Sequence, residues 1–396
     1  MARSKAREHR LPKKLDDLVE FFETHDMGDY WDQMPEAQFE IDVKRKTTQV
    51  PIARSPVILF LGAGASAPLG KPVMEHFVKK LASDIKSDPE ASLLAAFISE
   101  RGNDLELIMG DIENLLSLSY VSTFVLDSGY EVNKNVAASL RSLIRHSIIR
   151  EYRAIDIKCA IEVYQPLFDT IFSHIDPATH CLPIFTTNYD LAIERFCSEQ
   201  YSKYELTNGM DSPSLEGEIL WTPSSFEFFR LRDKVRNLAL FKLHGSVNWM
   251  RVTSTGRIVQ SLPMYDVIDS DEYQNAIIYP AGRRVATSQP YLTGYHYFSK
   301  CCEYAKVILA IGYSFHDYDT LASILKARQV NEDLMLILLA PNAYDVLETT
   351  IRAHDEEGIF WTRPIYGRFG DLDSQDKYLT QINDCLEHQL KNSSTP

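Results

Sequence analysis

Short apolar runs recur along the chain from Val57 onward. Each is five to seven residues long and rich in β-branched residues, which is too brief for a helix and typical of a strand buried on both faces of a parallel sheet. Segments with helical periodicity separate the runs, so the pattern predicts an α/β fold with a Rossmann-like, doubly wound parallel sheet. The runs are VILFL at Val57, PIFTT at Pro183, LALFKL at Leu238, AIIYP at Ala276, KVILAIG at Lys306 and LMLILLA at Leu334.

Two stretches interrupt this alternation. DLELIMGDIENLLSLSYV from Asp104, with further amphipathic segments, predicts an inserted helical subdomain over about 85–180. Turn signals such as NGMDSPS and WTPSS predict a loop-rich insertion over about 198–236. The first fifty residues begin with a basic stretch and continue with acids and aromatics at helix-like spacing. We therefore expect an appendage for interaction or oligomerisation at 1–50, followed by one domain at 51–396.

Composition narrows the class of protein. A chain of 396 residues with 45% hydrophobic content can bury a large core, and a net charge of −14 argues against direct nucleic-acid binding. The six cysteines form no Cys-x-x-Cys pair, so we expect buried thiols and no metal site. No signal peptide is evident and no apolar run approaches the roughly 20 residues needed to span a membrane. We expect a cytoplasmic protein.

A glycine loop follows the first apolar run. Gly62, Ala63, Gly64 and Ser66 precede a helical segment, VMEHFVKKLA. Small residues let the backbone approach a pyrophosphate, and free amides at the start of a helix attract its charge. The alternative is a tight strand-to-helix turn without a ligand.

The segment after this loop disfavours hydride transfer. A redox Rossmann site has an acidic residue about 20 positions further on, at the end of a second strand, where it holds the ribose hydroxyls. Here Asp84 and Asp88 lie in SDIKSDPE, which belongs to helix and turn.

Polar residues follow the second and third apolar runs. Thr187, Asn188 and Asp190 follow the second, and the amide of Asn188 could orient a carboxamide or a ribose. The alternative is that Asn188 or Asp190 caps the next helix. His244 follows the third run beside a glycine, where a ligand could approach, and its pKa range suits proton transfer near neutrality. A structural histidine is the alternative.

The fifth and sixth runs end in similar positions. Gly312 and Ser314 could contact phosphate or ribose, while Asp317 and Asp319 could cap or begin a helix. Asn342 could meet an adenine ribose or make a turn.

In this order, GAGAS…GKP, TTNYD, KLHGS, GYSFHDYD and LLAPN resemble the sirtuin (SIR2) family, specifically its bacterial SIR2-like branch, over about Pro56 to Arg368. The resemblance implies an NAD⁺-binding fold and NAD⁺ glycohydrolase activity in antiphage defence. Deacetylating sirtuins carry a zinc module built from two cysteine pairs and an Ile-Pro-Asp-Phe-Arg-like stretch. This chain has no such cysteine pairs and has Gly70-Lys71-Pro72-Val73-Met74 instead, which disfavours peptide deacetylation.

The resemblance also implies roles for single residues. Asn188 and Asp190 would lie near the nicotinamide ribose, with His244 as catalytic base. The products would be nicotinamide and ADP-ribose, or a cyclic product. The residues implied to bind NAD⁺ are Ala63, Gly64 and Ser66 at the phosphates, Gly312, Ser314 and Asn342 in the adenosine half, and also Gly62 and Thr187.

Partners are implied in the same way. Related proteins of this length suggest a homo-oligomer that works with a HerA-like hexameric ATPase, and the chain itself has no Gly-x-x-x-x-Gly-Lys-[Ser/Thr] motif. FFETHDMGDYWDQM…FEIDVKRK near the N-terminus resembles a segment of CopG-like antitoxins. Three alternatives stay open: a non-catalytic NAD⁺ or ADP-ribose sensor, a zinc-free protein deacylase and an antitoxin-like scaffold.

Overall fold

The computed structural model describes residues 51–86, 88, 90–213, 219–261, 272–278, 288–315, 317–355 and 361–392. The chain divides into two units, 1–48 and 49–396, and every described residue lies in the second. The predicted appendage at 1–50 therefore lies outside the described residues. Within them, no helix combines the length and the apolar character needed to cross a membrane.

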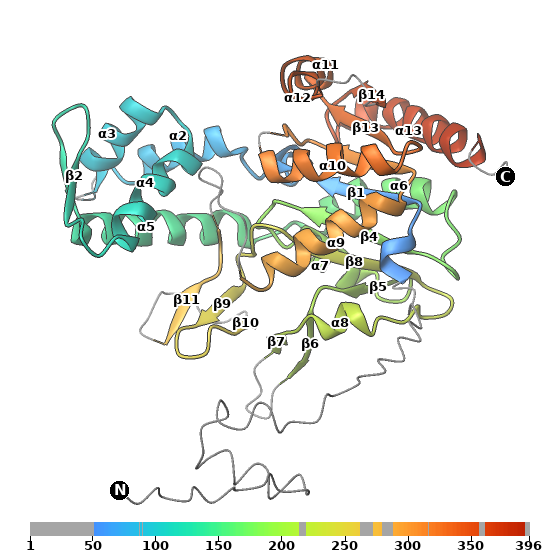
Figure 1. Ribbon diagram of the computed structural model, residues 1–396, viewed down its shortest axis with the longest axis horizontal. Helices are drawn as coiled ribbons and strands as arrows, with labels where there is room; N and C mark the ends of the chain where they lie inside the picture. Colours follow the sequence, from blue (N-terminus) through green and yellow to red (C-terminus); the bar gives the residue numbers. More distant parts are fainter. Residues whose placement is uncertain are drawn as a thin grey trace, which may run out of the picture. The chain divides into compact units, whose positions relative to one another are not determined.

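A seven-stranded parallel sheet forms the centre of the second unit (Figure 1). Its order is β14-β13-β12-β1-β4-β8-β5. The predicted doubly wound α/β architecture is confirmed. The strands are β1 (Val57–Leu61), β4 (Cys181–Thr186), β5 (Tyr204–Thr207), β8 (Arg236–Lys242), β12 (Val307–Ile311), β13 (Met335–Ala340) and β14 (Trp361–Tyr366).

The strand order places a crevice beside β1. From β1 the chain continues to β4 and β8 on one side, and it later returns to β12 and β13 on the other. Such a switch in direction opens a crevice at the carboxyl ends of the strands, where α/β sheets bind ligands. The motifs at the ends of the apolar runs therefore converge.

Alternate residues of β1 enter two different cores. Val57, Leu59 and Leu61 pack on one face of the sheet with helices α6 (Ile157–Phe172), α7 (Ala192–Glu199) and α13 (Leu372–Asn392). Ile58 and Phe60 pack on the other face with α9 (Tyr291–Tyr304), α10 (Tyr318–Val330) and α11 (Ala343–Val346). Burial on both faces explains why the central strands are continuous apolar runs.

Five of the six predicted strands are present, and one is wrong. In AIIYP, residues 276–278 form no strand; they follow β11 (Tyr273–Asn275), which is antiparallel to its neighbour in a second sheet. The edge strands β5 and β14 were not predicted. YELT and WTRPIY include polar residues, and an edge strand tolerates Pro364 because one side of its backbone lacks a partner strand.

A second sheet takes two of its five strands from the stretch predicted as a loop-rich insertion. Its order is β11-β9-β10-β7-β6, with antiparallel pairs throughout. Within 198–236, the described residues contain β5, β6, β7 and a short helix, joined by turns and loops. The elements are β6 (Met210–Pro213), β7 (Ile219–Trp221), α8 (Ser224–Glu227), β9 (Trp249–Val252) and β10 (Ile258–Gln260).

The helical segment packs in a third core, which it shares with Met250 and Val259 of the second sheet, and its limits differ from the predicted 85–180. It begins earlier, at α2, and α6 packs on the central sheet instead. A small hairpin, β2 (Thr123–Val125) and β3 (Glu131–Asn133), joins it. The helices that share this core are α2 (Met74–Asp84), α3 (Ala91–Arg101), α4 (Leu105–Ser117) and α5 (Lys134–Arg153), together called the helical layer below.

Candidate functional site

A cleft of about 1810 Å³ lies at the carboxyl ends of the central strands. It is larger than the roughly 300–1,000 Å³ of a typical small-molecule site. Residues from the ends of β1, β4, β8, β12, β13 and β14 line it, together with residues of α2, α4 and α5. Of the predicted site residues, those lining the cleft are Ala63, Gly64, Ser66, Thr187, Asn188, Asp190, His244, Gly312, Ser314 and Asn342.

Gly62 does not line the cleft; it lets two loops cross. A Cβ on Gly62 would lie 2.5 Å from the carbonyl oxygen of Gly312, and one on Gly312 would lie 2.4 Å from Cα of Gly64. The Gly64 amide donates to the Gly312 carbonyl at 2.9 Å. Gly312 also has φ of +60°, which favours glycine. Close packing of the loops after β1 and β12 accounts for these glycines, as in the alternative given above for the loop.

Backbone amides of the glycine loop, predicted to be free for a phosphate, largely form hydrogen bonds within the protein. The loop forms two short 3₁₀ turns, Ala63–Ala65 and Ala67–Leu69, and α2 begins only at Met74. Besides the Gly64 amide, the Ser66 amide donates to the Ala63 carbonyl at 3.1 Å. Ala63, Gly64 and Ser66 still line the cleft, but the amides of Gly64 and Ser66 already have partners.

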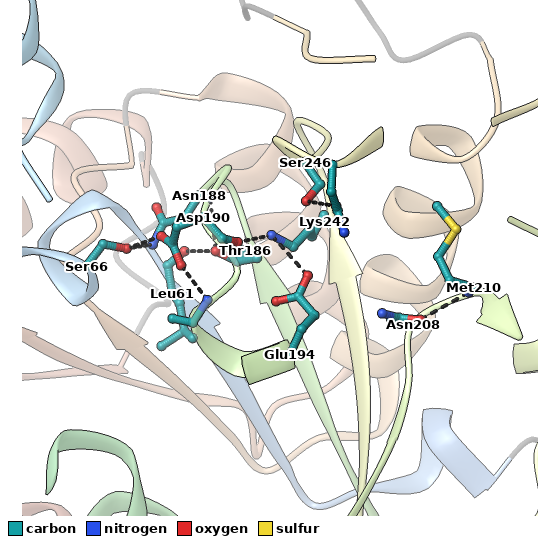
Figure 2. A network of polar contacts seen from close by, with 12 residues as sticks. Leu61, Ser66, Thr186, Asn188, Asp190, Glu194, Asn208, Met210, Lys242 and Ser246 are labelled. Atoms are coloured by element: carbon teal, nitrogen blue, oxygen red, sulfur yellow. Dashed lines mark hydrogen bonds and ion pairs between the residues drawn. The ribbon is translucent and has the colours of Figure 1, made fainter. Parts of the chain in front are cut away.

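Asn188, Ser66 and Asp190 form a directed chain of hydrogen bonds (Figure 2). Nδ2 of Asn188 donates to the Gly62 carbonyl at 2.8 Å and to Oγ of Ser66 at 2.9 Å, and Oγ donates in turn to Oδ2 of Asp190 at 2.5 Å. A carbonyl only accepts, so the amide orientation of Asn188 is fixed. Both of its N–H groups are used, and Oδ1 is the group that can meet a ligand, as an acceptor and not as a donor.

Hydrogen bonds on both sides of Asn188 hold the turn that carries it. Oγ1 of Thr186 donates to the Leu61 carbonyl at 2.9 Å and accepts the Asn188 amide at 3.0 Å. The Thr187 amide reaches the same Leu61 carbonyl at 3.4 Å. Oδ1 of Asp190 accepts the amide of Ala192, the first residue of α7, at 2.9 Å. Asp190 therefore binds the start of α7 from one position before its N-cap, Leu191, alongside the contact with Ser66.

His244 is buried against a carboxylate that follows β12. Its Nε2 lies 3.6 Å from Oδ2 of Asp317 and 3.4 Å from the hydroxyl of Tyr295. Tyr295 and Thr320 both donate to Oδ2 of Asp317, at 3.0 and 2.8 Å. The expected cap is also present, because Oδ1 accepts the Asp319 amide at 3.0 Å.

The charge of Asp317 is stabilised by these neighbours. Burial by itself would raise the pKa of its carboxyl, but hydrogen bonds and attraction from His244, with hydrogen bonds from Thr320 and Tyr295, outweigh it and lower the pKa to about 2. Asp317 is thus a carboxylate at neutral pH and can stabilise a protonated His244. The sequence indicated Asp317 only as a cap, since the two residues are distant along the chain, and it gave no sign of Tyr295.

The helical layer adds residues to the cleft that the sequence did not indicate. Burial, followed by the charges of Asp104 and Asp317, raises the pKa of Glu106 to about 7. Lys71 precedes this layer and contacts it: its Nζ donates to the Glu151 carbonyl of α5 at 2.7 Å, and burial lowers its pKa. This side of the cleft therefore carries a carboxyl that can hold a proton near neutrality.

The far end of the cleft contains Gly312, Ser314 and Asn342. Asn342 is exposed and precedes α11 without capping it through its side chain, so its amide is available to a ligand. Arg368 and Asp371, which follow β14, line the cleft as well and were not predicted.

The described ranges contain no group of three or more His, Cys, Asp or Glu residues placed to hold a metal ion. All six cysteines are free thiols; Cys159 and Cys385 are half-buried and the other four are buried.

Residues 183–359 match the family model described as SIR2-like domain. This range contains Asn188, His244 and Asp317 and ends before Arg368. No curated protein matches the chain.

Several solved structures resemble the chain at low identity. A mutant Sir2 homologue in complex with ADP-ribose is 15% identical, with a TM-score of 0.42, 86% of this chain covered and 98% of that one. A Sir2 homologue in complex with NAD is 14% identical, with a TM-score of 0.38 and coverage of 86% and 95%. Sir2Tm bound to a propionylated peptide is 12% identical, with a TM-score of 0.37 and coverage of 86% and 99%.

Proposed function

We propose that this chain is an NAD⁺ glycohydrolase, which cleaves NAD⁺ to nicotinamide and ADP-ribose. One observation carries the proposal: the Asn188–Ser66–Asp190 chain and the His244–Asp317 pair line the same cleft, and all of these residues except Ser66 lie in the range that matches a SIR2-like domain. The first group offers acceptors and negative charge, and the second offers a base.

These groups suit the chemistry of N-glycosidic cleavage. As nicotinamide leaves, positive charge develops on the ribose, and Oδ1 of Asn188 with the nearby Asp190 carboxylate favours that charge. His244 takes a proton from water or from a ribose hydroxyl, and Asp317 stabilises the imidazolium that forms. Attack by water gives ADP-ribose, whereas attack by a bound hydroxyl gives a cyclic product.

The rest of the cleft suits the remainder of the dinucleotide. The phosphates lie beside Ala63, Gly64 and Ser66, and Thr187 lies by the first ribose. Gly312, Ser314 and Asn342 face the adenosine half. The helical layer closes the opposite side and limits access of water to the reacting carbon.

The direct test is turnover of NAD⁺ with separation of the products. Asn188→Ala and His244→Ala should each lower kcat/KM at least 100-fold, about 2.7 kcal/mol of transition-state stabilisation. Asn135→Ala and His296→Ala are matched controls, since both residues are exposed and lie outside the cleft lining, and each should stay within about twofold of the parent.

Two outcomes would replace the proposal. If the parent protein binds ADP-ribose but never consumes NAD⁺, and His244→Ala retains that binding, the protein is a sensor. A parent that consumes NAD⁺ only when an acylated peptide is present is a deacylase.

We further propose that the enzyme serves antiphage defence by depleting NAD⁺, and that assembly into a homo-oligomer with a HerA-like hexameric ATPase gates it. This part rests on the family resemblance and on the harm that an ungated NAD⁺ hydrolase would do to its own cell. Co-expression with the neighbouring gene should yield a complex by light scattering whose NAD⁺ turnover exceeds that of the chain alone at least tenfold. A fully active lone monomer would contradict it.

A further inference from the structure

A buried lysine lies directly behind the candidate site. Lys242 is the last residue of β8, two positions before His244, and its side chain is 3% exposed. It does not line the cleft. A buried ammonium group is costly unless it is paired, and a methionine or leucine would fill a similar volume without that cost.

Its partners belong to the segment that carries Asn188. Nζ of Lys242 donates to the backbone carbonyl of Asp190 and lies 3.3 Å from Oε1 of Glu194 on α7 (Figure 2). The other carboxylate oxygen of Glu194, Oε2, is buried without a hydrogen-bond partner among the described residues. Burial raises the pKa of Glu194 in spite of the attraction to Lys242. A pair that leaves a buried oxygen unsatisfied is weak evidence for a purely stabilising role.

The same two segments also meet through their backbones. The Leu243 amide donates to the Thr186 carbonyl at 2.8 Å, and the Val247 amide donates to the Tyr189 carbonyl at 3.0 Å. The carbonyl of Asp190, which extends beyond these two contacts, is held by the Lys242 side chain. Asp190 in turn receives the hydrogen bond of Ser66, which orients Asn188.

We propose that Lys242, held in place by Glu194, is a positioning residue that fixes the Asn188–Asp190 turn against the strand end carrying His244. It acts through Asp190 from behind the cleft and does not touch the substrate. The proposal deepens the proposed NAD⁺ cleavage and rests on it for its kinetic consequence.

The kinetic test separates positioning from folding. Lys242→Met should lower kcat for NAD⁺ about 100-fold, as a displacement of about 1 Å does. KM should change less than about threefold, because Gly312 and Asn342, proposed to bind the adenosine half, follow β12 and β13 and not β8. Lys242→Met leaves Glu194 buried and unpaired, so the double variant Lys242→Met/Glu194→Leu removes both groups. It should regain the melting temperature of the parent without regaining kcat.

The matched control is Lys300→Met. Lys300 is exposed and paired with Glu303 at 2.9 Å, and its replacement should leave kcat and KM within about twofold of the parent. A double variant that recovers both the melting temperature and kcat would show that Lys242 is only structural, and would overturn the proposal.

A second readout does not depend on turnover. In protein labelled with ¹⁵N at asparagine, the signal lost in Asn188→Ala identifies the side-chain amide of Asn188. That signal should shift in the double variant and stay in place in Lys300→Met; an unmoved signal in the double variant would overturn the proposal. If the parent hydrolyses no NAD⁺, the proposed function fails, and this comparison alone decides whether Lys242 positions Asn188.

Discussion

The hydrogen bonds that side chains at this site already make within the protein limit what each can offer to a ligand. Asn188 has one amide group, and both of its N–H groups are directed at Gly62 and Ser66. The sequence allowed Asn188 to be donor or acceptor, whereas the structure leaves it an acceptor toward the cleft. Ser66 both donates and accepts in the same chain, so it transmits the position of Asp190 to Asn188.

The acid sensitivity of folding tests the environment of Asp317. Its folded-state pKa of about 2 lies below the ordinary 3.8, so its ionised form contributes stability above pH 3.8 that is lost as pH falls toward 2. The full contribution is roughly 2 kcal/mol, of which about 1 kcal/mol is lost by pH 3. Urea unfolding of the parent should therefore lose about 1 kcal/mol more between pH 5 and pH 3 than unfolding of Asp317→Asn.

The control for this measurement is Asp333→Asn, at an exposed residue. It should retain the pH dependence of the parent. Equal losses in the parent and in Asp317→Asn would show that the carboxyl is not held ionised. Asp317→Asn should also lower kcat about tenfold or more, because the imidazolium of His244 loses its counter-charge.

Close packing between two loops explains the glycines at positions 62, 64 and 312 better than binding of a ligand does. The loops after β1 and β12 meet backbone to backbone, and Gly62, Gly64 and Gly312 each lack the Cβ that would obstruct the contact. This crossing places the glycine loop beside Ser314 and so shapes one side of the cleft. The fold therefore requires these residues whether or not a phosphate is bound.

Comparing Gly312→Ala with Gly129→Ala separates destabilisation by the close contact between the loops from destabilisation by a positive φ alone. Both Gly312 and Gly129 have positive φ, at +60° and +83°, but a Cβ on Gly129 would meet open space. Gly129→Ala should lower the free energy of unfolding by about 1 kcal/mol. Gly312→Ala should lower it by about 3 kcal/mol, since strain and overpacking combine. Equal effects in urea unfolding would refute the close approach of the two loops.

Every described residue that lines the cleft belongs to the second unit. These residues lie between Ala63 and Asp371, and two layers of helices cover the central sheet of this unit. The helical layer supplies the wall opposite the strand ends. The described lining residues thus come from segments more than 300 residues apart in sequence.

A chain that starts at residue 49 should therefore keep the site. We expect it to melt within a few degrees of the full chain and to bind ADP-ribose with a Kd within about threefold, measured by calorimetry. A folded 49–396 chain without binding would show that 1–48 contributes to the site. Loss of a partner complex with binding retained would assign 1–48 to assembly.

The central strands and the residues at their ends were readable from local pattern. A strand buried on both faces must be apolar throughout, so β1, β4, β8, β12 and β13 stand out as runs, and parallel strands bring their ends to one edge. Asn188, His244 and Gly312 were found in this way. The edge strands β5 and β14 are buried less completely and left no such run.

Contacts between distant segments came from the folded chain alone. His244 pairs with Asp317, and Lys242 pairs with Asp190. Glu106 lines the cleft with the strand ends, and Gly62 packs against Gly312 where a Cβ would clash. Each of these contacts depends on how segments far apart in sequence lie in space. A periodic pattern records which residues are buried, because burial demands apolar character. It does not record which polar group a buried side chain meets, because that depends on the order of the strands in the sheet.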